Sequence, residues 1–415
     1  MRDPGMTRRQ LLLGAAAAPL FVRSGALGLD GRAPANERVG LGFIGTGGRG
    51  SNLINDFKNL KEAQCVAFAD CFQARRERWA QQLQGKAYAD LRDLVADKAV
   101  DAVVIATPDH WHVPAGLLAV RAGKDVYIEK PLGISVHHDQ VMRKEVRERK
   151  RVFQYGTQQR SSRHCRVACE LVRNGKIGKV KEIKVWAPNG REGGSLEEIP
   201  VPPGFDYDLW LGPAPKAPYT KDRCTNQGAY FIYDYAIGFI AGWGAHPLDL
   251  LVWGYDIHKA GRVEVEGTGV FRPDHLFNTV HSWNVNYVFA GGLRMNFTHG
   301  DNLTVFVGTE GTVKVSRARL ETEPAELAKA DLGAAAVRLV ESSNHAQNFI
   351  GAVKTRKDPV SCIEDAVISD VISHLGDIAV RTGRKIVWDW EKEEIVGDPE
   401  ASKMLRRPLR PPWTL

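Results

Sequence analysis

Lys130 and His246 are the residues of this sequence with the clearest capacity for chemistry. A histidine can accept a proton near neutral pH, and a lysine ammonium can stabilise negative charge that develops on an oxygen. The oxidation of an alcohol needs both, because the hydroxyl proton must leave as a ketone forms. Taken alone, Lys130 could equally be a surface lysine, and a structural role would be more common for His246. The pair is therefore a catalytic hypothesis that depends on its surroundings.

A glycine-rich loop near the start of the chain is the strongest candidate binding site. It has the pattern G-x-G-x-x-G, follows the apolar run from Val39 to Ile44, and precedes a stretch of helical character. The glycines permit a tight turn, and the helix N-terminus offers amide hydrogens to a pyrophosphate. The pattern predicts a dinucleotide site on Gly45, Thr46, Gly47, Gly48, Arg49 and Gly50.

Asp70 stands at the end of the second predicted strand, 25 residues after Gly45. A carboxylate there accepts hydrogen bonds from the adenosine ribose and repels a 2′-phosphate. The predicted cofactor is therefore NAD rather than NADP, a preference that Arg75 and Arg76 could soften. The alternative is a structural glycine turn with Asp70 as a helix cap.

Two further segments follow predicted strands, at Thr107-Pro108-Asp109-His110-Trp111-His112 and at Glu129-Lys130-Pro131. The carboxyl ends of parallel strands line the ligand crevice. The first segment could instead serve structure, with Asp109 as a helix cap and Trp111 in the core. The predicted cofactor contacts in these segments are Thr107, Pro108, His112, Glu129 and Lys130.

Aromatic and polar residues gather before His246 in the second half of the chain. His246 and Asp249 are three residues apart and would share one face of a helix. The predicted substrate contacts are Lys130, Tyr230, Asp234, Tyr235, His246 and Asp249.

The elements that must position these residues change character along the chain. Between 39 and 155, short apolar strands alternate with helices, which predicts a doubly wound parallel sheet. Between 263 and 315, alternating runs with glycine breaks predict a largely antiparallel sheet, and helices are expected at 344–354 and 363–382. The length of 415 residues exceeds what one core usually serves. We predict an α/β chain with domains at 37–157 and 158–415.

The composition is that of an ordinary globular protein, with 43% hydrophobic and 25% charged residues. The net charge is +7, of which +3 falls in the first 26 residues, so the remainder is too weakly basic to predict a nucleic-acid partner. The six cysteines form no C-x-x-C pair, and neither a disulfide framework nor a metal site is predicted.

Residues 1–26 have the features of an export signal. Arg8 and Arg9 precede an alanine-rich apolar run, and Ser24-Gly25-Ala26 supplies small residues for cleavage. The paired arginines favour the twin-arginine route to the periplasm. A membrane anchor or a disordered start is the alternative, and no membrane span is predicted in the mature chain.

The glycine loop, Thr107-Pro108, Glu129-Lys130-Pro131 and Trp243-Gly244-Ala245-His246 occur in an order that resembles the Gfo/Idh/MocA oxidoreductases. The segments at 210–215 and 407–413 resemble the exported branch of that family. The resemblance implies a Rossmann domain, then an α/β domain with an open, mainly antiparallel sheet that often forms an oligomer interface. It also implies bound NAD or NADP, a sugar or cyclitol substrate, and a homo-oligomer, either a dimer or a tetramer.

The same resemblance assigns roles to single residues. Lys130 matches the lysine of the family's Glu-Lys-Pro motif and His246 its acid/base histidine. Gln158 falls where the family reaches the nicotinamide, and Arg160 is expected to contact substrate. Many members have an aspartate four residues before the histidine, but this chain has Gly242. The orienting carboxylate is therefore either missing or supplied from elsewhere in the chain, by Asp234 or Asp249.

Export also bears on the function, because a periplasm should hold little free NAD. We expect a sugar or cyclitol oxidoreductase that keeps its cofactor and recycles it in place. One alternative is a glycosidase or lyase that acts through a transient keto sugar. The other is a sugar-binding protein without enzymatic activity.

Overall fold

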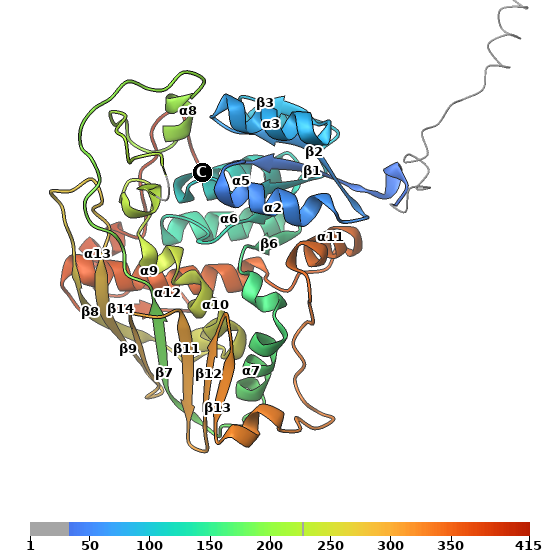
Figure 1. The fold of residues 1–415 in the computed structure, drawn as a ribbon. Helices are drawn as coiled ribbons and strands as arrows, with labels where there is room; N and C mark the ends of the chain where they lie inside the picture. Colours follow the sequence, from blue (N-terminus) through green and yellow to red (C-terminus); the bar gives the residue numbers. More distant parts are fainter. Residues whose placement is uncertain (1–32, 226–227) are drawn as a thin grey trace, which may run out of the picture.

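The computed structural model describes residues 33–225 and 228–415, so the predicted export signal at 1–26 lies outside the described residues. Within them, the chain forms two sheets with helices between and around them (Figure 1). The strands of the first sheet all precede residue 156, and those of the second all follow it. The predicted α/β class with two unlike sheets is confirmed.

The first sheet is fully parallel. Its strands are β1 (Val39–Ile44), β2 (Ala63–Ala69), β3 (Lys86–Tyr88), β4 (Ala102–Ile105), β5 (Asp125–Ile128) and β6 (Phe153–Tyr155). Their order is β3-β2-β1-β4-β5-β6. The strands that follow β1 are added on one side of it as far as β3, and β4 to β6 are added on the other side, so the strand order reverses at the β1–β4 boundary. Ligands of such sheets bind outside the carboxyl ends of the strands, at that switch point.

Helices cover this sheet, which is why its central strands are continuous apolar runs. These helices are α2 (Gly48–Lys58), α3 (Gln73–Leu83), α4 (Leu91–Ala96), α5 (His112–Arg121) and α6 (Val136–Glu148). All six residues of β1 and all four of β5 are buried. The edge strand β3 is partly exposed and has no apolar run, so the sequence pattern does not predict it.

One helix of the second half returns to the first sheet. α11 (His345–Thr355) buries Phe349 in a core shared with Phe57 and Tyr127. The ring centroid of Phe349 lies 6.1 Å from that of Phe57 and 5.9 Å from that of Tyr127. The packing of the first sheet therefore depends on a segment far beyond residue 157.

The second sheet has nine strands. They are β7 (Val180–Ala187), β8 (Val263–Val270), β9 (Ser282–Phe289), β10 (Arg294–His299), β11 (Leu303–Gly308), β12 (Thr312–Ser316), β13 (Leu320–Glu323), β14 (Ile386–Asp389) and β15 (Glu394–Ile395). The order is β13-β12-β11-β7-β10-β9-β8-β14-β15, and only the β7–β10 pair is parallel. The mainly antiparallel prediction is confirmed.

The remaining α-helices are α7 (Arg163–Arg173), α8 (Tyr207–Leu211), α9 (Phe239–Gly242), α10 (Ala245–Gly254), α12 (Ile363–Thr382) and α13 (Pro399–Lys403). α12 contacts α6 on one side and β8 on the other, and it crosses the middle of the molecule (Figure 1). No helix among the described residues is both long and apolar enough to span a membrane.

Candidate active site

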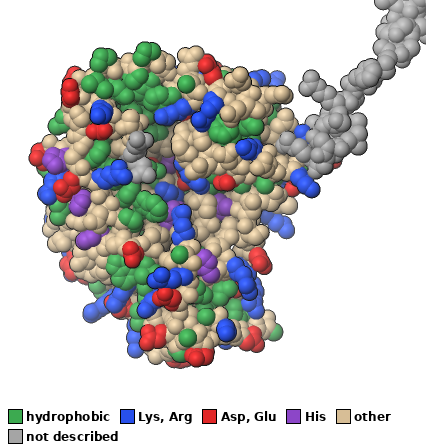
Figure 2. Space-filling view, in the orientation of Figure 1, with side chains coloured by type: hydrophobic (Ala, Val, Ile, Leu, Met, Phe, Trp, Pro, Cys, Tyr) green, Lys and Arg blue, Asp and Glu red, His purple; other side chains and the backbone are tan. Residues whose placement is uncertain are grey.

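A cavity of about 700 Å³ lies at the carboxyl ends of the first sheet and extends to the second half of the chain. Histidine and basic side chains gather near the cleft between the two halves of the molecule (Figure 2). The predicted site residues that line the cavity are Gly45, Gly47, Gly48, Arg49, Asp70, Thr107, Pro108, His112, Glu129, Lys130, Gln158, Tyr230 and His246. The fold therefore brings most of the predicted cofactor residues and both predicted catalytic residues to one cavity.

The glycine loop has the backbone that a pyrophosphate site requires. Gly45 adopts a φ of +82°, which favours glycine, and a Cβ on Gly50 would lie 1.9 Å from the carbonyl oxygen of Gly45. A Cβ on Gly48 would meet no atom within 4 Å, so this side of the loop is open. Among the residues that the structure describes, no side chain caps the N-terminus of α2. These features fit an anionic ligand.

Asp70 holds the glycine loop and also faces the cavity. Its Oδ2 accepts hydrogen bonds from the amide of Thr46 at 2.7 Å and its hydroxyl at 3.1 Å, and Oδ1 accepts one from the amide of Phe72 at 2.9 Å. A carboxylate has about four acceptor positions, so it retains capacity for ribose hydroxyls. Thr46 itself is fully buried and, like Gly50, does not line the cavity. Thr46 and Gly50, which were predicted to contact the cofactor, therefore determine the shape of the loop instead.

The ends of β4 and β5 are tied together by His112. Its Nδ1 lies 2.6 Å from the carbonyl oxygen of Pro131, and its Nε2 lies 3.0 Å from that of Thr107. The hydroxyl of Thr107 is buried and has no hydrogen-bond partner among the described residues. This orphaned polar atom on the cavity wall is a further sign that a polar ligand completes the site.

Glu129 is the centre of a polar cluster in the cavity wall. Its Oε1 accepts hydrogen bonds from Arg49 Nε at 2.8 Å and from Gln158 Nε2 at 2.8 Å. Gln158 also donates to the hydroxyl of Tyr127 at 2.7 Å. These hydrogen bonds hold Arg49 and Gln158, two predicted cofactor residues, against Glu129.

Lys130 is held at the boundary between the two halves of the chain. Its Nζ donates a hydrogen bond to the carbonyl oxygen of Gly242 at 2.7 Å and lies 5.5 Å from the ring centre of Tyr230. Burial lowers the pKa of Lys130, while Glu129 and Asp109 act in the opposite direction. The ammonium is thus held at the carbonyl group of Gly242, the position where the resemblance led us to expect an aspartate.

His246 faces Arg317, a residue that no sequence pattern selected. Its Nε2 lies 3.0 Å from Arg317 Nη2. A guanidinium has no acceptor, so Nε2 must accept this bond and Nδ1 carries the proton. Burial holds the pKa of His246 well below its ordinary value, and Lys130 and Arg317 lower it further. The imidazole is therefore neutral at pH 7 and can act as a base.

The predicted replacements for the aspartate at Gly242 are corrected by the structure. Arg160 binds Asp249 with two hydrogen bonds of 2.7 Å, and both side chains are buried outside the cavity. Asp234 is exposed and borders a separate cavity. Neither carboxylate orients His246, whose Nδ1 has no partner among the described residues.

Two other predicted substrate contacts also fall outside the cavity. The Tyr235 hydroxyl is buried and accepts a hydrogen bond from Arg223 at 3.0 Å. Arg160 bonds to Asp365 at 2.5 Å in addition to Asp249. The polar groups of both residues are bound to other side chains of the protein, and a pattern of residue types cannot predict such contacts.

Asp109 lines the cavity together with Asp70 and Glu129, although it was not among the predicted site residues. It is 3% exposed, and its Oδ2 has no hydrogen-bond partner among the described residues. Burial raises the pKa of Asp109 to about 8, although Lys130 opposes this. The sequence did indicate a cavity position for Asp109, because this residue follows a predicted strand. A role as a helix cap accounted for the same position equally well.

Comparison with protein families supports this reading of the site. Residues 39–157 match the Gfo/Idh/MocA model described as oxidoreductase family, NAD-binding Rossmann fold. Residues 182–415 match the model described as oxidoreductase family, C-terminal alpha/beta domain. The predicted NAD-binding domain and the family resemblance are confirmed.

Several curated proteins are similar to part of the chain. A myo-inositol 2-dehydrogenase of Thermotoga maritima is 27% identical over 168 residues, which are 40% of this chain and 47% of that protein. An inositol 2-dehydrogenase of Rubrobacter xylanophilus is 31% identical over 156 residues, 37% of this chain and 45% of that protein. A glycosyl hydrolase family 109 protein of Shewanella is 33% identical over 114 residues, 25% of each chain. The matches thus span less than half the length of these relatives.

Solved structures share the fold over most of the chain. GenD2 from gentamicin A biosynthesis, in complex with NAD, has a TM-score of 0.63 at 18% identity and covers 86% of this chain and 98% of its own. A levoglucosan dehydrogenase in complex with NADH and levoglucosan has a TM-score of 0.62 at 15% identity, with coverages of 84% and 99%.

Proposed function

The chain belongs to the Gfo/Idh/MocA oxidoreductase family, and from this we propose that it oxidises a secondary hydroxyl of a sugar or cyclitol with NAD. The observation that carries the proposal is one continuous cavity lined by the glycine loop, Asp70, Lys130 and His246. The inositol dehydrogenases among its relatives support this substrate class.

The side chains at the inner end of the cavity suit proton removal from an alcohol. NAD supplies the hydride acceptor when it is bound. His246 accepts the hydroxyl proton at Nε2, for which Arg317 must first release that nitrogen. Lys130 donates a hydrogen bond to the substrate oxygen and stabilises its developing negative charge. Tyr230 and Trp243 give the sugar an apolar wall.

The cofactor remains bound between turnovers in this proposal. The basis is the predicted export signal, since an exported enzyme has little free NAD to exchange with. A second substrate, or a later step on the same substrate, then returns the cofactor to its oxidised form. The proposal also includes a homo-oligomer, a dimer or tetramer, which sedimentation would measure.

The decisive experiment follows the absorbance of bound NADH while the purified protein meets a panel of sugars and cyclitols. We expect denaturation to release NAD(H), and we expect one substrate group to reduce the bound cofactor. Lys130→Met and His246→Asn should abolish reduction while the cofactor stays bound. Asp234→Asn, at an exposed position outside the cavity, is the matched control. A protein without any dinucleotide affinity would refute the proposal.

Redox-assisted cleavage is the second candidate. Asp109 favours it, because a carboxyl group with a pKa of about 8 is largely protonated at neutral pH and can donate to a leaving oxygen. The partial similarity to glycosyl hydrolase family 109 proteins also favours it. Oxidation to a keto sugar, with NAD as the hydride acceptor, would acidify the neighbouring C–H bond and permit elimination of the leaving group. Addition of water and return of the hydride would then give the cleaved sugar. This candidate requires cleaved sugar of unchanged oxidation state without an added acceptor.

A further inference from the structure

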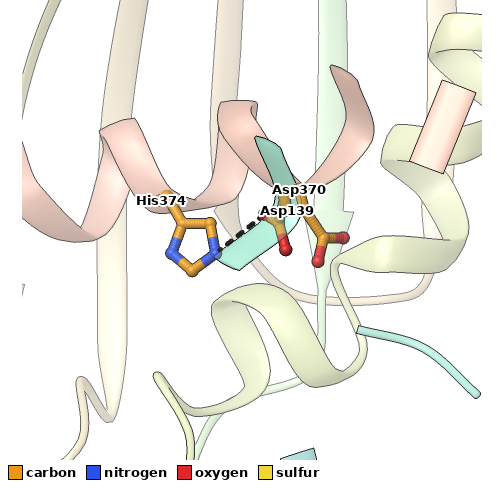
Figure 3. Close-up of side chains that lie close together, drawn as sticks. All are labelled: Asp139, Asp370 and His374. Carbon is orange, nitrogen blue, oxygen red and sulfur yellow. Dashed lines mark ion pairs between the residues drawn. The ribbon is translucent and has the colours of Figure 1, made fainter. Parts of the chain in front are cut away.

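Away from the cavity, a histidine and two aspartates meet inside the protein. Asp139 comes from α6, and Asp370 and His374 come from α12, where they are one turn apart (Figure 3). Their exposures are 0%, 1% and 4%. One ligand atom from each residue lies within 4.8 Å of the other two. Two helices thus present three metal-ligating side chains to one buried point.

Asp139 is the side chain that ordinary packing leaves unexplained. Neither of its carboxylate oxygens has a hydrogen-bond partner among the described residues. Nε2 of His374 also lacks a partner among these residues. Arg143, whose charge acts on Asp139, is instead bound by Glu393 at 2.8 and 2.6 Å. A buried carboxylate without partners is strongly destabilising, so a proton, a water molecule or a cation must satisfy it.

The spacing of the ligand atoms favours a cation. His374 Nε2 and Asp139 Oδ2 are 3.5 Å apart and face each other (Figure 3). That distance is too long for a good hydrogen bond. It is the separation of two ligands on a tetrahedral ion with bonds of about 2.0–2.2 Å, which are the lengths found for zinc with histidine and carboxylate. Two carboxylates also balance the charge of a divalent ion.

We propose that Asp139, Asp370 and His374 bind one divalent cation of the zinc class. Three protein ligands leave one position for a water molecule. Asp370 is already oriented by its neighbours, as a ligand must be: Tyr155 donates a hydrogen bond to Oδ1 at 2.5 Å, and the amide of Leu132 donates one to Oδ2 at 2.5 Å.

The site has a structural consequence for the catalytic lysine. Leu132 follows Lys130 by two residues, so Asp370 links α12 to the loop that carries the lysine. A cation shared with Asp139 would join α6, α12 and this loop. Its role is to hold the two halves of the chain together, because none of the three ligands lines the cavity.

The test measures zinc in the full chain, purified in zinc-supplemented medium and dialysed against zinc-free buffer. We expect about one zinc ion per chain. Removal by a chelator should lower Tm, and zinc should restore it. Asp139→Asn and His374→Gln should lose both the metal and the zinc-dependent rise in Tm. Asp377→Asn, equally buried on α12 but outside the set, should keep both.

Three results would overturn the proposal. The first is a dialysed wild-type protein without zinc whose Tm does not respond to added zinc. The second is zinc retained by Asp139→Asn, which would place the ion elsewhere. The third is an Asp139→Asn protein at least as stable as wild type in the presence of zinc, which would show that a protonated carboxyl occupies this position. The first result needs no variant, so misfolding cannot obscure it.

Discussion

The contact between Arg317 and His246 controls the state of the proposed base. Arg317 lies at the end of β12, lines the cavity and occupies the one acceptor nitrogen of the imidazole. It therefore adds to the effect of burial and Lys130 in keeping the histidine neutral, and it keeps Nε2 from the substrate until the guanidinium moves. Nothing in the sequence near Arg317 indicates this position, because the contact joins a strand end to a helix 71 residues away.

Replacing Arg317 should change the pH dependence of the reaction. After burial and Lys130, Arg317 is the next cause that lowers the pKa of His246. Oxidation requires the neutral imidazole, so the rate falls as pH drops through this pKa. Arg317→Met removes a positive charge, raises the pKa, and should move the acidic limb to higher pH. Single-turnover reduction of the bound cofactor measures this, with Arg319→Met as the exposed control. An unmoved or downward-shifted limb would refute the role of Arg317.

Asp109 should make the folded protein less stable as pH rises. Its pKa is raised from 3.8 to about 8 in the folded state. Between these values the unfolded chain loses a proton that the folded chain keeps, so the free energy of unfolding falls with increasing pH. Asp109→Asn removes this dependence and should gain on the order of a few kcal/mol over wild type near pH 8, with no gain near pH 4. Denaturant unfolding across this range measures it, and Asp234→Asn should follow wild type.

At the scale of the elements, the apolar runs predicted most of the first sheet. The central strands have a continuous apolar pattern because both of their faces are covered, whereas β3, β13 and β15 are short strands at sheet edges with weak patterns. The return of α11 to the first sheet could not be predicted, because its amphipathic pattern does not say which sheet it covers. Local signals thus located the glycine loop and Lys130, while long-range packing decided that Asp249 and Tyr235 lie elsewhere.

Two glycines of one loop should respond differently to the same substitution. In Gly50→Ala the new Cβ would overlap the carbonyl oxygen of Gly45, so we expect a loss of about 1–3 kcal/mol in the free energy of unfolding. In Gly48→Ala the Cβ enters open space, so stability without cofactor should be kept. That space is where a phosphate approaches the helix N-terminus, and NAD affinity should fall about tenfold or more. Equal NAD affinity in Gly48→Ala and wild type would contradict this placement of the site.

At the scale of the whole molecule, the site exists only in the folded chain. Its wall combines the β1–α2 loop, the end of β5, the start of α10 and the end of β12. Lys130 is fixed by a carbonyl group 112 residues away, at Gly242. The proposed catalytic residues Lys130 and His246 therefore meet only when both halves are assembled. A protein that is exported in the unfolded state would have to bind NAD after export, once it has folded.

The route of export should decide whether the protein carries its cofactor. The twin-arginine route moves folded proteins, so we expect protein exported with residues 1–26 intact to carry NAD(H), measured after denaturation. Arg8→Lys combined with Arg9→Lys should stay in the cytoplasm and hold the same amount, because the substitutions do not touch the site. Replacing residues 1–26 with a signal for export in the unfolded state should give protein that folds but lacks NAD(H). Equal cofactor content by both routes would show that the site fills after export, and the closed redox cycle would lose its basis.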